Sequence, residues 1–220
     1  LSRFNADLAN DLGNLLNRSL PLVQRYIDGI VPEAGPASGA LSEDISRAVA
    51  GIETHLDRLN YRDALITTWQ LISRCNKFID EREPWLLHKQ GKRVELDAVL
   101  YDVVDAIRAV AILISPFMPQ VAEEVWEQLG LKDAAVEMRW EDARAGALAP
   151  GTRINRGVPI FPRIDIDGVL AQEQEQAVQE AEQTKGTGMI SFRQFQEIEL
   201  VTGKVLEAER VPDADKLLVM

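Results

Sequence analysis

The stretch LDAVLYDVVDAIRAVAILI, residues 96–114, decides the fold that we expect from this sequence. Its apolar residues recur at steps of three and four, which is the spacing of an α-helix, and they are Leu96, Val99, Leu100, Val103, Ile107, Val110, Ala111 and Ile114. Apolar side chains cover much of the circumference of this helix rather than one stripe. A helix of that kind needs partners on several sides. We therefore expect it at the centre of a helical bundle.

Four further segments carry the apolar spacing of amphipathic helices, and they span residues 4–30, 42–59, 61–82 and 121–130. Pro21 should kink the first of these helices or divide it in two, because proline removes one backbone hydrogen bond and clashes with the preceding turn. Five helices joined by short connections predict an all-α fold, an antiparallel five-helix bundle.

The composition changes after this bundle, which we expect to occupy residues 1–130. Proline and glycine punctuate residues 131–168, and we expect an extended strap that packs on the bundle. Residues 169–189 are rich in Gln, Glu and Ala, as in a linker or a solvated helix. Residues 190–220 contain LVTGKVLEAE, which reads as a strand and predicts the incomplete start of a β-domain.

The overall composition limits the classes of function. The 220 residues are 46% hydrophobic, which is enough for a proper core, and no apolar run reaches the roughly 18 residues of a membrane span. A single cysteine, Cys75, suits a reducing cytoplasm. The net charge of −11 argues against non-specific coating of a phosphate backbone, so any nucleic-acid site must be local. The chain begins at Leu1 rather than at a methionine, and it reads like a piece of a longer protein.

Motifs for bond chemistry are missing from the sequence. His55 and His88 have no cysteine, histidine or carboxylate at metal-ligand spacing, so we expect no metal site. There is no glycine-rich phosphate loop and no nucleophile elbow. Glu123 and Glu124 are adjacent, so on a helix they point about 100° apart and do not converge on one atom. We expect no catalytic residue and no cofactor site in these 220 residues.

Five polar residues share one stripe of the first expected helix: Asp7, Asp11, Asn14, Arg18 and Arg25. Two interpretations are open. The stripe is a solvated face on which Asp and Arg, or Asn and Arg, pair with each other. Alternatively, Asn14 and Arg18 read an unpaired base, because their donors and acceptors match its Watson–Crick edge.

Trp85 is the second candidate for a contact with RNA. It follows Pro84 at the end of the third helix and lies on no apolar stripe, in contrast to Trp69 and Trp126. A large aromatic ring in a loop is buried in many proteins, but an exposed one can stack on a base. We expect Trp85 to come near Arg18 because the third helix can return antiparallel to the first.

Four stretches of the chain, in this order, resemble one family: RFNADLANDLGNLLNR (3–18), NKFIDEREPW (76–85), SPFMPQVAEEVWEQLG (115–130) and IFPRIDID (160–167). They are similar to the C-terminal α-helical anticodon-binding domain of bacterial methionyl-tRNA synthetases, which are class I synthetases. Residues 190–218 resemble the opening of the tRNA-binding oligonucleotide/oligosaccharide-fold (OB-fold) domain that many of these enzymes carry next.

The resemblance implies a role for each candidate residue. Asn14 and Arg18 would read the first anticodon base, and Trp85 would stack on the anticodon loop of a methionine tRNA with the anticodon CAU. The full-length protein would be a methionine–tRNA ligase that uses ATP with Mg²⁺ in the cytoplasm. The catalytic motifs of that family are absent here, so these residues alone should be inactive. Further partners implied are the enzyme's own catalytic domain and a second copy, through a complete C-terminal domain.

The resemblance implies a structural role for two residues of the strap, and the last segment departs from the family at one position. Arg163 and Asp165 would be packing and salt-bridge residues rather than contacts to RNA. Val201 replaces a basic residue of the family's OB-fold motif, which weakens the expectation that residues 190–220 bind RNA. Two alternatives stay open: the corresponding domain of another class I synthetase, and a helical scaffold or tRNA-binding module that is not an enzyme.

Overall fold

The computed structural model describes residues 4–155, 157–162, 164–166, 168, 192–198, 209–210 and 218–219. It divides into two units, Leu1–Ile164 and Asp165–Met220. Among the helices of these described residues, none is both long enough and apolar enough to cross a membrane.

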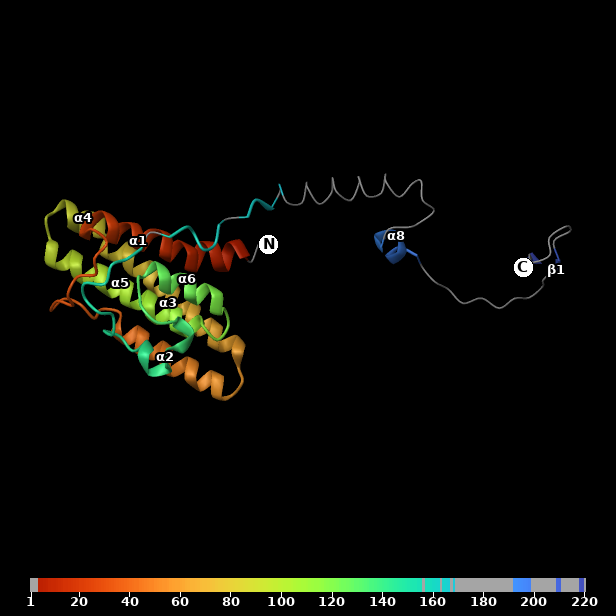
Figure 1. The fold of residues 1–220 in the computed structure, drawn as a ribbon, viewed down its shortest axis with the longest axis horizontal. Helices are drawn as coiled ribbons and strands as arrows, with labels where there is room; N and C mark the ends of the chain where they lie inside the picture. Colours follow the sequence, from red (N-terminus) through yellow and green to blue (C-terminus); the bar gives the residue numbers. More distant parts are fainter. Residues whose placement is uncertain are drawn as a thin grey trace. The chain divides into compact units, whose positions relative to one another are not determined.

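The first unit is helical, as expected (Figure 1). It begins with a π-helical segment, continues with six α-helices, and ends with two short 3-10 helices. They are η1 (Phe4–Gly13), α1 (Asn14–Ile27), α2 (Ser42–Asp57), α3 (Tyr61–Arg82), α4 (Pro84–Lys89), α5 (Arg93–Ile114), α6 (Pro119–Gln128), η2 (Ala135–Glu137) and η3 (Trp140–Ala143). The prediction of an all-α domain is confirmed, and α4 is a helix that the apolar spacing did not reveal.

Helix α5 lies at the centre of this bundle. Every residue from Ala98 to Ile114 is buried, and α5 packs against α1, α2, α3, α4 and α6. Its position is therefore the one that its apolar circumference predicts. The other helices each bury one stripe against it, because only one side of each faces the core.

Helix α5 also buries an ion pair that the apolar pattern did not predict. Arg108 Nε lies 2.9 Å from Asp105 Oδ1, and each side chain is 4% exposed. The guanidinium donates further hydrogen bonds to the backbone carbonyls of Asp142 (2.5 Å) and Arg144 (2.6 Å). The Asp105 carboxylate accepts the backbone N–H of Gly146 at 2.5 Å. The pair thus fastens the segment after α6 to the core, and its buried charges are hydrogen-bonded.

Asp102, one turn before this pair, fastens a second loop to α5. Its carboxylate accepts the backbone N–H groups of Gly39 at 2.6 Å and of Ala40 at 2.8 Å, close to the start of α2. Burial raises the pKa of Asp102, and the two N–H donors oppose this rise because they stabilise the charged form. Asp102 therefore holds the end of the loop that leads into α2.

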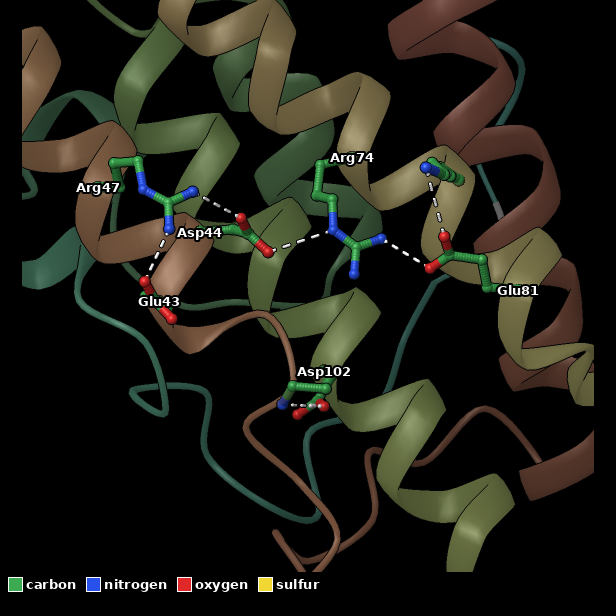
Figure 2. Close-up of polar contacts among 8 residues, drawn as sticks. Glu43, Asp44, Arg47, Arg74, Glu81 and Asp102 are labelled. Atoms are coloured by element: carbon green, nitrogen blue, oxygen red, sulfur yellow. Dashed lines mark hydrogen bonds and ion pairs between the residues drawn. The ribbon is translucent and has the colours of Figure 1, made fainter.

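A chain of ion pairs joins α2 to α3 on the outside of the bundle (Figure 2). Arg47 reaches Glu43 (2.8 Å) and Asp44 (3.1 Å) on its own helix. Arg74 of α3 contacts Asp44 at 3.3 Å and Glu81 at 3.0 Å, so it bridges the two helices. Exposed pairs of this kind stabilise a fold by only about 0.2–1 kcal/mol each.

Pro21 does not divide the first helix. It lies inside α1, which is continuous from Asn14 to Ile27, and the change of helix type falls earlier, between Gly13 and Asn14. Both Pro21 and Asn17, whose carbonyl loses its usual donor, are exposed, so water can replace the missing hydrogen bond. Of the two expectations for Pro21, a kink or a division of the helix, the division is wrong for this reason.

Part of the expected strap lies against the first helix (teal in Figure 1). The side-chain amide of Asn5 both donates to the carbonyl of Ile164 (2.8 Å) and accepts its N–H (2.9 Å). The rings of Phe4 and Phe161 meet edge to face at 5.9 Å. Arg163 lies outside the described residues. These contacts join the first turn of η1 to the strap, 159 residues later in the sequence, and Asn5 makes both hydrogen bonds.

The second unit is described only in short pieces. They are the helix α8 (Phe192–Gln196) and two paired antiparallel strands, β1 (Glu209–Arg210) and β2 (Leu218–Val219). The expected linker at 169–189 and most of the expected strand at 200–209 lie outside the described residues. An OB-fold for residues 190–220 stays a prediction.

Candidate nucleic-acid interface

The first helix and α3 run parallel, and polar contacts join them in register. Trp69 donates its indole N–H to the carbonyl of Asp7 at 2.8 Å, and Asn76 donates to the carbonyl of Asp11 at 3.1 Å. The two partners are 62 residues apart in the first contact and 65 in the second. From the first contact to the second, the residue number increases on both helices, which is the order expected of parallel helices. The expectation that α3 returns antiparallel to the first helix is wrong, because α2 supplies the return and α3 resumes the first direction.

The two candidate base readers continue this register. Asn14 donates from Nδ2 to Asn76 Oδ1 at 3.0 Å. Arg18 donates from both terminal nitrogens to the Asp80 carboxylate, and the Nη1–Oδ2 distance is 3.4 Å. These partners of Asn14 and Arg18 come from α3 rather than from the same face of α1. Each side chain is held by a group on the neighbouring helix.

Both side chains keep capacity to bind something else. The side chain of Arg18 is 30% exposed and that of Asp80 is 61% exposed. Two of the five N–H groups of a guanidinium are used by Asp80, and the Oδ1 of Asn14 accepts from no donor in the described part of the chain. The arrangement therefore presents a fixed acceptor and several donors at the surface.

The first half of the stripe carries the acidic residues Asp7 and Asp11, and the second half carries the basic residues Arg18 and Arg25. Burial and the neighbouring Asp7 carboxylate raise the pKa of Asp11 in the first half. In the second half, the hydrogen bond from Arg18 lowers the pKa of Asp80, because it stabilises the charged carboxylate.

Trp85 lies at the start of α4, in a short helix rather than in a loop. Glu83 has a φ of 43° in the left-handed region, which turns the chain sharply after α3. Pro84 is buried and occupies the first position of α4, where its fixed φ suits a helix start. Trp85 follows it and is 41% exposed. The buried proline thus holds the tryptophan at the surface.

The four tryptophans differ in whether their indole N–H has a partner. Trp69, Trp126 and Trp140 donate to the backbone carbonyls of Asp7, Lys132 and Val49, respectively. Trp85 has no acceptor among the residues that the structure describes. Indole N–H groups in a core are normally paired, whereas an exposed ring is free to stack. Trp85 is therefore the tryptophan whose indole N–H has no hydrogen-bond acceptor within the described residues.

The structure brings Asn14 and Arg18 to the C-terminal half of α3, and Trp85 follows directly after that helix. It shows no direct contact between Trp85 and the other two. The sequence analysis missed Asn76 and Asp80, although their spacing of four residues matches that of Asn14 and Arg18. That match was a signal which could have identified them as partners.

An open, largely apolar groove of about 1020 Å³ lies on the same side of α3 as Trp69, between η1 and the turn after α5. None of the three candidate residues lines it. Within the described part of the chain, no group of His, Cys, Asp or Glu side chains is arranged to hold a metal ion.

A family profile for the anticodon-binding domain of tRNA ligase matches residues 40–200, which is more than half of the chain. The chain belongs to this family of anticodon-binding domains. Trp85 lies within the matched residues of this anticodon-binding domain, and the helix that carries Asn14 and Arg18 precedes them.

Curated relatives of this anticodon-binding domain match its whole length. It is 38% identical to the methionine–tRNA ligase of Caldanaerobacter subterraneus subsp. tengcongensis, over 100% of the chain and 35% of the relative. It is 35% identical to that of Bacillus subtilis, over 99% of the chain and 35% of the relative. The chain spans about 35% of the length of these relatives.

Solved structures agree with this family. Methionyl-tRNA synthetase of Mycobacterium tuberculosis in its free state superposes with a TM-score of 0.67 at 32% identity, over 74% of this chain and 34% of that one. The same enzyme in complex with methionyl-adenylate gives a TM-score of 0.62 at 30% identity, over 74% of this chain and 32% of that one. The anticodon-binding domain thus shares both sequence and fold with one region of these enzymes.

Proposed function

We propose that this chain is the tRNA-recognition portion of a methionyl-tRNA synthetase and that it binds the CAU anticodon loop of methionine tRNA. The observation that carries the proposal is the pairing of Asn14 with Asn76 and of Arg18 with Asp80. It fixes two side chains at the surface of a domain whose family binds anticodons.

Asn14 and Arg18 have the chemistry to read the first anticodon base, which is cytosine. The Watson–Crick edge of cytosine offers one amino donor beside two acceptors. The free Oδ1 of Asn14 can accept from the amino group, and the remaining N–H groups of Arg18 can donate to the acceptors. Uracil carries a carbonyl in place of the amino group, so its carbonyl oxygen would face Asn14 Oδ1, and neither atom can donate a hydrogen bond.

Trp85 supplies a stacking platform in this proposal. Its ring is 41% exposed, and its indole N–H has no partner in the described part of the chain. Stacking one base on such a ring contributes about 1–3 kcal/mol and tolerates any base. Trp85 therefore provides affinity, and Asn14 and Arg18 provide selectivity.

The whole enzyme would attach methionine to the tRNA with ATP and Mg²⁺, in a catalytic domain that the curated relatives have room for in the rest of their length. It would do so in the cytoplasm. Residues 190–220 would begin an OB-fold through which two copies associate. These parts of the proposal rest on the relatives and on the sequence resemblance.

The test is the affinity of the chain for anticodon stem-loops that bear CAU, GAU or CAC. We expect CAU to bind most tightly. Arg18→Ala or Asn14→Ala should cost about 1–3 kcal/mol with CAU and relax discrimination at the first base. Equal affinity of the wild-type chain for all three loops would overturn the assignment to methionine tRNA. Tightest binding of GAU or CAC would indicate another class I ligase.

A matched control separates stacking from loss of an aromatic side chain. Trp85→Ala should weaken the binding of all three stem-loops by about 1–3 kcal/mol. Tyr61 is 54% exposed at the opposite end of α3, and Tyr61→Ala should leave RNA affinity unchanged. If no stem-loop binds the wild-type chain at all, the domain is a scaffold rather than an anticodon reader.

A further inference from the structure

Residues 12–27 and residues 84–94 contain no Asp or Glu, and they are two of several such stretches in this acidic chain. The whole sequence has 35 acidic residues among 220 and a net charge of −11. Together the two segments contain His88 and five Lys or Arg residues, which are Arg18, Arg25, Lys89, Lys92 and Arg93. Asn14, Arg18 and Trp85 all lie in these same segments.

The fold brings the two segments into contact. The ring of His88, in α4, stacks on that of Tyr26, in α1, with centroids 4.3 Å apart and planes at 21°. Arg93, at the start of α5, donates to the carbonyl of Tyr26 at 3.1 Å. The Arg25 guanidinium lies 5.6 Å from the centre of the Tyr26 ring. The end of α1, the end of α4 and the start of α5 therefore meet at one place.

We call this cluster the basic end, defined by Arg25, His88, Lys89, Lys92 and Arg93. Its charge is only partly compensated. Arg93 pairs with Asp97 at 2.8 Å, but Arg25, Lys89 and Lys92 form no ion pair with any carboxylate that the structure describes. All three are exposed.

Carboxylates also flank the basic end. Asp28 follows α1, Glu83 precedes α4, and Glu95 lies in the first turn of α5, all of them exposed. None is paired with a basic residue of the cluster in the described part of the chain. Arg25, Lys89 and Lys92 thus keep their N–H groups available to bind an anion.

The basic end continues the face that carries Trp85. Residues three apart on a helix point to the same side, so His88 lies on the side of α4 that presents Trp85. A base stacked on Trp85 would therefore lie on the side of α4 that leads to the turn between α4 and α5. Lys89 and Lys92 stand in and beside that turn, where Gly91 adopts a φ of 69°.

We infer that the basic end binds phosphodiester groups of the RNA strand whose bases lie on Asn14, Arg18 and Trp85. The inference rests on the function proposed above. The three base contacts select the anticodon, and the basic end supplies affinity that does not depend on sequence. It offsets the repulsion that a net charge of −11 exerts on RNA.

The experiment compares the salt dependence of binding to the CAU stem-loop in two double variants of the 220-residue chain. Lys89→Gln with Lys92→Gln removes two unpaired cations from the basic end. Arg62→Gln with Lys132→Gln removes the same charge from two exposed cations, near the start of α3 and after α6, that also lack a described ion pair. Circular dichroism and thermal melting verify that both variants fold.

Each phosphate contact to a single strand contributes about −0.7 to the slope of log affinity against log salt concentration. The Lys89/Lys92 variant should therefore lose about 1.4 from the steepness of that slope and bind roughly 25-fold more weakly near 0.1 M salt. The ratio of CAU to GAU affinity should stay at the wild-type value. Lys89→Arg with Lys92→Arg should restore the slope.

Two results would overturn the inference: an unchanged slope in the Lys89/Lys92 variant, or an equal loss in the control variant. Either result can be distinguished from failure of the proposed function, which has its own criterion. That function fails if the wild-type chain does not discriminate between CAU and GAU, whatever the slopes are. A reduced slope without discrimination would support the phosphate contacts and reject the anticodon reading.

Discussion

Arg18 of α1 and Asp80 of α3 form a two-point ion pair across 62 residues of sequence. A carboxylate that accepts two parallel N–H groups holds a guanidinium in one plane, and this orientation is what a base reader needs. The pair is exposed, so its contribution to folding stability is small. Its importance lies in where it directs the remaining N–H groups of Arg18.

Asp80→Asn should reduce discrimination between anticodon loops without unfolding the chain. The amide keeps one acceptor but loses the charge that holds Arg18, so we expect the preference for CAU over GAU to fall by roughly 1 kcal/mol, or about fivefold. Stem-loop affinities measure it. Asp57→Asn removes an exposed charge at the end of α2, far along the sequence from the interface, and should not change the ratio. An unchanged ratio in the Asp80 variant would mean that Arg18 is oriented by other groups.

The pKa of Asp80 should respond to Arg18. The hydrogen bond from Arg18 lowers this pKa below its ordinary value of 3.8 in the folded chain. The ionised pair therefore favours the folded state above about pH 4, and this contribution is lost as the pH falls through the lowered pKa. Carboxyl NMR titration should show a midpoint below 3.8 that rises toward 3.8 in Arg18→Ala. A midpoint that does not move would contradict the pairing in solution.

Arg108→Ala should be among the most destabilising single changes in the bundle. It leaves Asp105 as a buried charge without its partner, and such changes cost about 3–5 kcal/mol of unfolding free energy. Urea denaturation measures the loss. Arg47→Ala removes a guanidinium that has two ionic partners, Glu43 and Asp44, from the surface of α2, and it should cost less than about 1 kcal/mol. Equal losses would show that Arg108 is not buried as described.

Gly130→Ala should destabilise the chain more than Gly91→Ala. Both glycines have positive φ values, 67° and 69°, so alanine carries a similar backbone penalty of about 1–2 kcal/mol at each. A methyl group at Gly130 would also overlap the carbonyl oxygen of Arg153, whereas nothing lies within 4 Å at Gly91. We therefore expect an additional loss of at least about 1 kcal/mol at Gly130 in urea denaturation. Equal losses would mean that the backbone at Arg153 shifts freely.

Much of the bundle could be predicted because apolar spacing reports helices directly. The central place of α5 follows from its apolar circumference, since such a helix can be satisfied only by burial on several sides. The same reasoning missed Asp102, Asp105 and Arg108. Three charged residues on a buried helix break the apolar pattern, and their hydrogen-bonding partners come from loops that no periodicity identifies.

The candidate site was only partly accessible from sequence. Shared helical spacing placed Asn14 and Arg18 on one stripe, but it could not show that α3 lies parallel to α1 and supplies Asn76 and Asp80. The helix direction was predicted wrongly, because spacing describes one helix at a time. The exposed position of Trp85 depends on the turn at Glu83 and on the buried Pro84, which a local pattern does not determine.

Sequence alone therefore determined the helical class of the first unit, the central helix and the three residues proposed to contact the anticodon. Only the tertiary structure decided which groups hold those residues, which tryptophan lacks a partner, and where the unpaired cations meet. The physical reason is that helix formation depends on neighbours within a few residues, whereas the contacts of Arg18 and of the basic end join segments more than 60 residues apart.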